Sequence, residues 1–376
     1  MGVNNLDPKG YWVGFTLVKG IGAVRIRALI KYFGNLETAW KANLQDLLKA
    51  GMSQKVAESI LHTRASVDLS EILEQMIRDG ISILTWEDPG YPKYLKEINQ
   101  PPPVLYIRGE ILPDDDLAVA VVGTRRITSY GRQVAEELGS YLARNGITMV
   151  SGMARGVDAV THEAVLRANG RTLAVLGSGV DVIYPPEYHK LAMRIIKQGA
   201  LLSDYPPGTQ PEAGNFPPRN RIISGLVRVV IVVEAGETSG ALITASFAAD
   251  QGRDVLAVPG NIYAPQSKGT NYLLQQGAKP LLCFEDVLET LNIDRVVAHR
   301  QARAILPGNP TEANILGVLS AEPIHIDEIC SLTGLSIEEV SATLTIMELK
   351  GMVRQMGGMN YTIAREIPGL YEVDLE

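Results

Sequence analysis

The stretch LAVAVVGTRRITSYG, residues 117–131, joins an apolar run to a loop that carries two arginines. A run that is apolar at nearly every position is typical of a strand buried on both faces of a sheet. Similar runs recur along the chain, and amphipathic helical patterns, such as residues 131–146 and 157–170, separate most of them. These further runs are residues 147–152, 171–177, 200–205, 228–235, 254–260 and 279–284. The alternation of strand and helix predicts an α/β fold with a doubly wound, mostly parallel sheet.

The first 85 residues differ from this pattern, because their apolar residues recur at helical spacing and no strand-like run is recognisable among them. Residues 17–34 place Gly20 and Gly22 directly before such a helical pattern, and residues 47–60 contain a weaker copy. This is the pattern of a helix-hairpin-helix, whose turn presents backbone N–H groups to a phosphate. A helical bundle in which the glycines only form tight turns explains the sequence equally well. We expect a helical domain, of helix-hairpin-helix or SAM-like type, over residues 1–85.

The sheet domain is expected over residues 86–294, followed by a linker over residues 295–308. It begins with residues 91–110, where the prolines hold the chain extended before a short strand.

Residues 309–366 contain three amphipathic helical patterns and then a hairpin signal at Gly357 and Gly358, an order typical of a winged helix. The expected recognition helix, residues 336–351, contains three glutamates and a single lysine. This charge favours a protein contact or a structural role over reading of the DNA major groove. Residues 367–376 are expected to form a tail.

The composition is that of a folded protein, with 46% hydrophobic and 20% charged residues. The formal net charge of −7 argues against a surface that coats nucleic acid as a whole, but it permits one basic groove. Cys283 and Cys330 lie outside any metal-binding motif, which indicates reduced thiols in a cytoplasmic protein. Neither a secretory signal nor a membrane-spanning stretch is expected.

The loops that follow the strands form the candidate site, because ligands of an open parallel sheet bind beyond the carboxyl ends of its strands. Arginines, hydroxyls and glycines gather in four of these loops, and several loops lead into a helix N-terminus, which attracts anions. The sequence therefore predicts a site for a polyanion. We expect NFPPRNRIISGL, residues 215–226, to supply one rigid loop, stiffened by Pro217 and Pro218.

Two common nucleotide-binding motifs are missing. Residues 121–131 do not form GxGxxG, and no GxxxxGK[ST] sequence occurs. Hydride transfer and ATP hydrolysis are therefore disfavoured, and we expect neither a cofactor nor a metal.

Two pairs of residues have the chemistry of acid–base or nucleophilic catalysis. Asp158 and His162 are spaced by one helical turn, and Glu234 precedes Ser239 in the same loop. The alternative is structural, with Asp158 capping a helix or pairing with an arginine and His162 hydrogen-bonded within the helix layer. We favour this alternative, because no nucleophile elbow and no second metal ligand accompany the pair.

Several motifs, in order, resemble those of the DNA-processing protein A family (DprA, also called Smf). They are YPKYLKEINQPPPVLYIRG at 91–109, AVVGTRRITSYG at 120–131, SGMARGVDAVTHEAVL at 151–166, FPPRNRIISGL at 216–226, VEAGETSGALITA at 233–245, LAVPGN at 256–261 and SKGTNYLLQQGA at 267–278. The resemblance implies an extended Rossmann-like sheet between a helical module and a winged-helix module. Arg125 stands at the arginine of the family's GSR motif, with Thr124 in place of serine, and Asp204 stands at a recurrent acidic position.

The resemblance also implies a function. Members of this family bind single-stranded DNA, protect it from nucleases and deliver it to the RecA recombinase during natural transformation of competent bacteria, and they form homodimers through the Rossmann-like domain. No enzymatic turnover is implied.

Together, the residues and the resemblance predict one DNA-binding groove. Arginines supply permanent charge, amides at helix starts bind phosphate oxygens, and Phe216 stacks on a base, with Tyr184 and Tyr263 as weaker candidates. The expected DNA-binding residues are Gly123, Thr124, Arg125, Arg126, Ser151, Gly152, Arg155, Gly156, Phe216, Arg219, Asn220, Arg221, Ser239, Gly240 and Lys268.

Two other functions compete with this prediction. The first is a nucleotide or nucleoside-phosphate hydrolase, because some proteins with related Rossmann-like folds cleave N-glycosidic bonds with a PGGxGTxxE loop. Residues 234–242, EAGETSGAL, lack the second adjacent glycine and the trailing glutamate of that loop. The third possibility is a regulator that binds duplex DNA through the winged helix.

Overall fold

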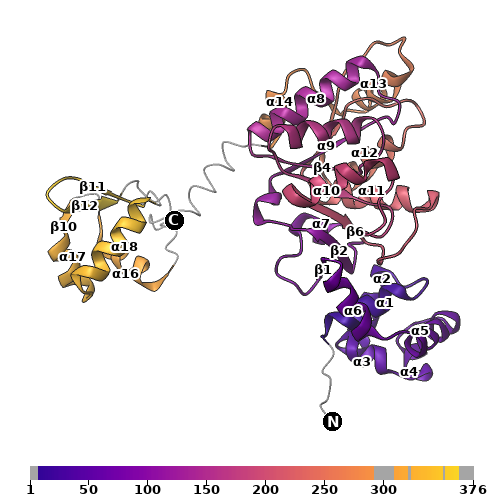
Figure 1. Ribbon diagram of the computed structural model, residues 1–376, viewed down its shortest axis with the longest axis horizontal. Coiled ribbons are helices and arrows are strands. Elements are labelled where there is room, and N and C mark those ends of the chain that lie inside the picture. The colour runs from indigo at the N-terminus through magenta and orange to yellow at the C-terminus, as the bar shows by residue number, and fades with distance from the viewer. Residues whose placement is uncertain (1–6, 292–308, 321–322, 350–351, 364–376) are drawn as a thin grey trace, which may run out of the picture. The chain divides into compact units, whose positions relative to one another are not determined.

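The computed structural model describes residues 7–291, 309–320, 323–349 and 352–363 (Figure 1). The chain divides into two compact units, Met1–Thr290 and Leu291–Glu376. The expected linker over residues 295–308 and the expected tail over residues 367–376 lie outside the described residues.

The first unit is built on a nine-stranded sheet with the order β1-β2-β6-β5-β4-β3-β7-β8-β9. Its strands are β1 (Ile81–Thr85), β2 (Val104–Gly109), β3 (Ala118–Val122), β4 (Thr148–Ser151), β5 (Thr172–Val175), β6 (Gly199–Ser203), β7 (Val229–Val232), β8 (Asp254–Ala257) and β9 (Lys279–Pro280). The seven neighbouring strands β6-β5-β4-β3-β7-β8-β9 are parallel, whereas β2 pairs antiparallel with both β6 and β1. The predicted mostly parallel α/β sheet is confirmed.

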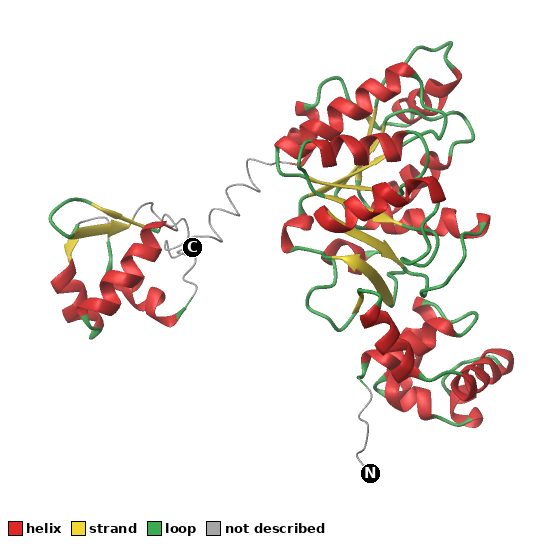
Figure 2. Ribbon diagram, viewed as in Figure 1, coloured by secondary structure: helices red, strands yellow, loops and turns green. Residues whose placement is uncertain are grey.

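Helices cover both faces of the sheet (Figure 2). Along β5, Leu173 belongs to one apolar core and Ala174 to the other, as alternate residues of a strand buried on both faces must. One core includes residues of α9 (Val157–Arg167) and α10 (His189–Gln198). The other includes residues of α11 (Phe216–Gly225) and α12 (Gly240–Asp250). Further helices of this unit are α7 (Lys93–Glu97), α8 (Ser129–Arg144), α13 (Lys268–Gln275) and α14 (Glu285–Leu291).

Strand β1 corrects the prediction that the first 85 residues contain no strand. It pairs with β2 from Ile81 opposite Arg108 to Thr85 opposite Val104. The sequence ISILT is short and half-polar, as suits a strand at the edge of a sheet, and only its pairing with β2 makes it a strand.

The helices before β1 form a bundle that packs on the sheet. They are α1 (Lys9–Leu17), α2 (Ala23–Phe33), α3 (Leu36–Lys41), α4 (Leu44–Lys49), α5 (Gln54–Ser66) and α6 (Leu69–Arg78). The rings of Trp12 and Trp86 meet edge to face with their centroids 5.8 Å apart, and the hydroxyl groups of Thr16 and Tyr106 lie 2.6 Å apart. Phe15 and Tyr106 belong to one apolar core. The bundle is therefore joined to the sheet by a common core.

The second unit has the predicted winged-helix architecture. Helices α16 (Pro310–Val318), α17 (Ile326–Thr333) and α18 (Ile337–Leu349) enclose a small core that includes Ile315, Ile329 and Leu344. β10 (Ile324–His325), β11 (Val353–Gln355) and β12 (Asn360–Ile363) form its three-stranded sheet. Among the described helices of both units, none has the length and apolar character that crossing a membrane requires.

Candidate functional site

The candidate site lies at the carboxyl ends of the parallel strands, where the direction of the strand order reverses. From β3 the chain continues to β4 on one side, and from β7 it continues to β8 on the other. The two outgoing loops diverge at such a point and leave a crevice between them. A cleft of about 780 Å³ lies there. Nine of the predicted site residues line it: Gly123, Thr124, Arg125, Arg126, Phe216, Arg219, Asn220, Ser239 and Gly240.

The loop after β3 is fixed by Glu234, which is buried and follows β7. The Thr128 amide donates a hydrogen bond to Glu234 Oε2 at 3.0 Å, and the Thr128 hydroxyl donates to Oε1. The same hydroxyl caps α8 by accepting a hydrogen bond from the Gly131 amide at 3.1 Å. Both oxygens of Glu234 are therefore engaged in shaping the loop, which does not favour the hydrolase hypothesis.

The cleft brings a cation and two aromatic rings together. The guanidinium carbon of Arg125 lies 5.7 Å from the centroid of the Phe216 ring. The centroids of the Tyr184 and Phe216 rings lie 5.6 Å apart, with an angle of 39° between the ring planes. Arg125 and Arg126 are exposed. Across the described ranges, neither arginine forms an ion pair with a carboxylate. The two guanidinium groups are thus available to an anionic ligand.

Arg219 lines the cleft, but its side chain is used within the protein. Only 5% of the residue is exposed, and Nη1 donates to the carbonyls of Gly152, at 2.9 Å, and Val175. Asp158 accepts hydrogen bonds from the amide of Gly152 at 3.1 Å and from Ala154 at 3.3 Å. Burial lowers the pKa of Arg219 to about 10, so it remains charged at neutral pH and offsets the negative charge of Asp158. Arg219 therefore joins the ends of β4 and β5 to α11.

Six predicted residues lie outside the cleft lining. The Ser151 hydroxyl is buried and donates to the Val121 carbonyl at 2.6 Å. Three basic residues form ion pairs: Arg155 with Glu187 at 2.6 Å, Arg221 with Asp204 at 2.5 Å and Lys268 with Glu237 at 3.0 Å.

The remaining two of these six residues are Gly152 and Gly156. Their lack of a side chain lets Arg219 and the loop after β3 approach the backbone closely. A Cβ on Gly152 would lie 2.6 Å from Arg219 Nη2, and a Cβ on Gly156 would collide with the Thr124 carbonyl. Gly156 also has a φ of +83°, which favours glycine. Both positions support the cleft without lining it.

Residues 215–226 do not form the expected loop, because α11 starts at Phe216. Pro217 and Pro218 occupy its first turn, where the missing N–H groups of proline cost nothing and the fixed φ suits a helix. The helix places Phe216 and Arg219 on the cleft and Arg221 outside it.

Part of the cleft wall, in the segments that follow β7 and β8, was not predicted from the sequence. Thr238, Ile243 and Gln266 line the cleft. The Gln266 carbonyl accepts a hydrogen bond from the Ala235 amide at 2.8 Å, which brings the loop after β8 across the loop after β7. Gln266 could have been identified from the sequence, because its loop follows the parallel strand β8.

His162 is fully buried and lies outside the cleft lining. Its Nδ1 lies 2.7 Å from the Thr172 hydroxyl, and burial lowers its pKa from 6.5 to about 3. Since Asp158 is engaged by the amides of Gly152 and Ala154, the geometry agrees with the structural interpretation of both residues.

We expect this buried histidine to make the first unit sensitive to acid. Between pH 6.5 and pH 3 the unfolded chain binds a proton at His162 that the folded chain does not bind. The free energy of unfolding should therefore fall as pH is lowered through this window, by about 2 kcal/mol between pH 6.5 and pH 5 from this residue. Urea denaturation at several pH values measures the slope. A His162→Gln variant should lack this part of it, and an unchanged slope would contradict the assignment.

Comparison with known proteins gives consistent matches. The family model described as DNA recombination-mediator protein A matches residues 82–292, and the DprA winged helix domain matches residues 299–359. Protein Smf of Synechocystis sp. is 37% identical to this chain, over 94% of this chain and 98% of the relative.

Two solved structures are also similar. The X-ray structure of DNA processing protein A from Streptococcus pneumoniae matches with a TM-score of 0.65 and 33% identity, over 74% of this chain and 97% of that one. DNA processing protein A from Helicobacter pylori, whose structure was described for its single-stranded DNA binding mode, matches with a TM-score of 0.52 and 34% identity. That match covers 57% of this chain and 96% of the other.

Proposed function

Because this chain belongs to the DNA recombination-mediator protein A family, we propose that it binds single-stranded DNA in the cleft between β3 and β7. The observation that supports this most is the unpaired guanidinium group of Arg125 beside the ring of Phe216. A binder that tolerates any sequence needs positive charge for the phosphates and a flat ring for the bases, and the cleft offers both.

Two kinds of group would hold the DNA backbone. Arg125 and Arg126 supply exposed positive charge on one side of the cleft. On the other side, α12 begins at Gly240, where the first amides and the positive end of the helix dipole favour a phosphate oxygen. We assign DNA binding to residues 86–294, and not to the helical domain of residues 1–85 or the winged helix of residues 309–366.

Membership of the family supports a proposal for the cellular role. We propose that the protein protects single-stranded DNA and helps to load RecA on it in the cytoplasm, as a homodimer formed through the Rossmann-like domain and without enzymatic turnover. The internal hydrogen bonds of Glu234, Asp158 and His162 support a role without turnover.

Salt dependence tests the proposed mode of binding. If about four phosphates are neutralised, the logarithm of the affinity for a labelled dT oligomer should fall with the logarithm of salt concentration with a slope of roughly −3. Fluorescence anisotropy at rising salt measures this slope. Failure of the oligomer to bind at low salt, or binding that does not respond to salt, would refute the proposal.

Phe216→Ala should weaken dT binding without changing the salt slope. Loss of one stacked base costs roughly 1–3 kcal/mol of binding free energy, and no phosphate contact is lost. The same anisotropy titration measures both quantities. Phe216→Leu is the matched control, because leucine still packs against Gly177 but cannot stack; if leucine restores full affinity, the ring is not a stacking surface.

A further inference from the structure

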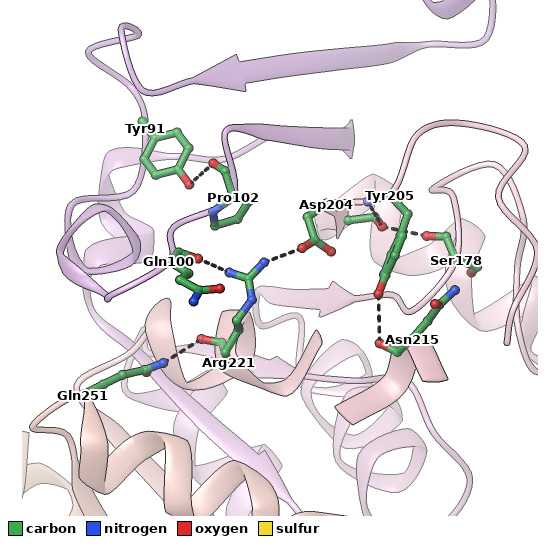
Figure 3. A network of polar contacts seen from close by, with 10 residues as sticks. Tyr91, Gln100, Pro102, Ser178, Asp204, Tyr205, Asn215, Arg221 and Gln251 are labelled. Atoms are coloured by element: carbon green, nitrogen blue, oxygen red, sulfur yellow. Dashed lines mark hydrogen bonds and ion pairs between the residues drawn. The ribbon is translucent and has the colours of Figure 1, made fainter. Parts of the chain in front are cut away.

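Arg221 makes a polar network on the side of α11 that does not line the cleft (Figure 3). Nη2 donates to Asp204 Oδ2 at 2.5 Å, and Nη1 donates to the Gln100 carbonyl. The side chains of Arg221 and Asp204 are 19% and 16% exposed. Gln251 Nε2 also donates to the Arg221 carbonyl, at 3.1 Å. Arg221 therefore connects α11 to three other segments of the chain: the end of β6, the proline-rich entry segment and the end of α12.

The acidic partner of Arg221 is itself held in place. Asp204 follows β6, and its neighbour Ser203 donates a hydrogen bond from Oγ to the Ser178 carbonyl at 2.7 Å. The Tyr205 amide donates to Ser203 Oγ at 3.0 Å, and the Tyr205 hydroxyl donates to the Asn215 carbonyl at 3.5 Å (Figure 3). Asn215 is the residue before α11. The end of β6 thus contacts α11 both at its start and, through Asp204, at Arg221.

Helix α11 connects the contacts of Arg221 to the cleft, because the helix also carries Phe216. Its first residue is Phe216, whose ring packs beside Gly177 and under the guanidinium of Arg125. A shift or rotation of α11 would therefore move the Phe216 ring relative to Arg125.

We propose that Arg221 and Asp204 form a positioning pair, which fixes α11 so that Phe216 is presented to single-stranded DNA, and that neither residue touches the DNA. This inference rests on the proposed function. Arg221 also differs from Arg125: both terminal nitrogens of Arg221 donate hydrogen bonds within the protein, whereas the guanidinium group of Arg125 lies over the Phe216 ring.

Salt titrations of dT binding distinguish positioning from phosphate contact. Arg221→Met and Asp204→Asn in the full-length chain should each weaken binding roughly fivefold to tenfold, as expected for coupled neighbours, with the wild-type salt slope. If Arg221 bound a phosphate, Arg221→Met would make the slope shallower by about 0.7, and Asp204→Asn would leave binding unchanged or strengthen it by freeing the arginine. Either of these results would overturn the proposal.

A double-mutant cycle with Phe216 separates positioning from general loss of structure. In a Phe216→Ala background, Arg221→Met should have little further effect on affinity, because the ring that it positions is absent. Arg221→Lys retains a charge that pairs with Asp204 and should restore most of the affinity. Urea denaturation of each variant confirms that it is folded at the temperature of the assay. Fully additive effects of Phe216→Ala and Arg221→Met would overturn the proposal.

Binding of dT by the wild-type protein shows whether the proposed function or only the positioning pair has failed. If it does not bind dT, the proposed function fails. If it binds dT and Arg125→Ala weakens binding, but Arg221→Met and Asp204→Asn bind like the wild type, only the positioning pair is refuted.

Discussion

Replacement of Arg219 by methionine is expected to lower the free energy of unfolding of the first unit by about 3–5 kcal/mol, the usual cost of leaving a buried charge without the opposite charge that offsets it. Arg219 is buried, with Asp158 as the charge that offsets it most. The substitution would leave the Asp158 carboxylate buried without that charge and the carbonyls of Gly152 and Val175 without their donor. Urea denaturation, followed by circular dichroism, measures the loss.

Two further variants test the reason for this loss. Arg155→Met removes another of the predicted site arginines, but its ion pair with Glu187 is exposed, so little change in stability is expected. Asp158→Asn in the Arg219→Met background should recover part of the lost stability, because it removes the unpaired charge. If Arg219→Met is as stable as Arg155→Met, Arg219 does not support the cleft.

Arg125→Ala is expected to cause the largest loss of DNA affinity. A hydrogen bond between charged partners is worth about 1.5–3 kcal/mol, so the affinity for dT should fall roughly 10-fold to 150-fold. Loss of one phosphate contact should also make the salt slope shallower by about 0.7. Stability should hardly change, since Arg125 is exposed and its main contact is the Phe216 ring. Anisotropy with labelled dT at several salt concentrations measures both effects.

Lys279→Ala is the matched control for Arg125→Ala. It also removes an exposed positive charge, but Lys279 pairs with Asp254, at the amino end of β8 and away from the carboxyl ends of the strands. We expect nearly wild-type affinity for this variant. Equal affinities of wild type and Arg125→Ala would rule Arg125 out as a DNA contact.

The fold could be predicted from the sequence because the apolar runs of its strands and the helical patterns between them are visible in short stretches of the chain. Strands buried on both faces are apolar at nearly every position, as residues 117–122 show, and helices between them force a parallel sheet. Strand β1 and helix α11 could not be predicted in this way. β1 is defined by its pairing with β2, and the prolines of α11 are equally compatible with a loop or with the first turn of a helix.

The position of the candidate site could also be predicted, but the roles of its arginines could not. The motif of residues 219–221 presents two arginines that look alike in the sequence. In the structure Arg219 contacts carbonyls 67 and 44 positions away, and Arg221 contacts a carbonyl 121 positions away. Whether an arginine is free or engaged depends on such distant partners. Arg125 and Arg126 remain exposed because the loop after β3, fixed by Glu234, projects them toward solvent.

A crystal structure of the full-length protein with a short dT oligomer tests the central claim most directly. We expect phosphates within hydrogen-bond distance of Arg125 or Arg126 and of the first amides of α12, and a base stacked on Phe216. Arg221 should still pair with Asp204. An oligomer bound elsewhere, with the cleft between β3 and β7 empty, would contradict the account.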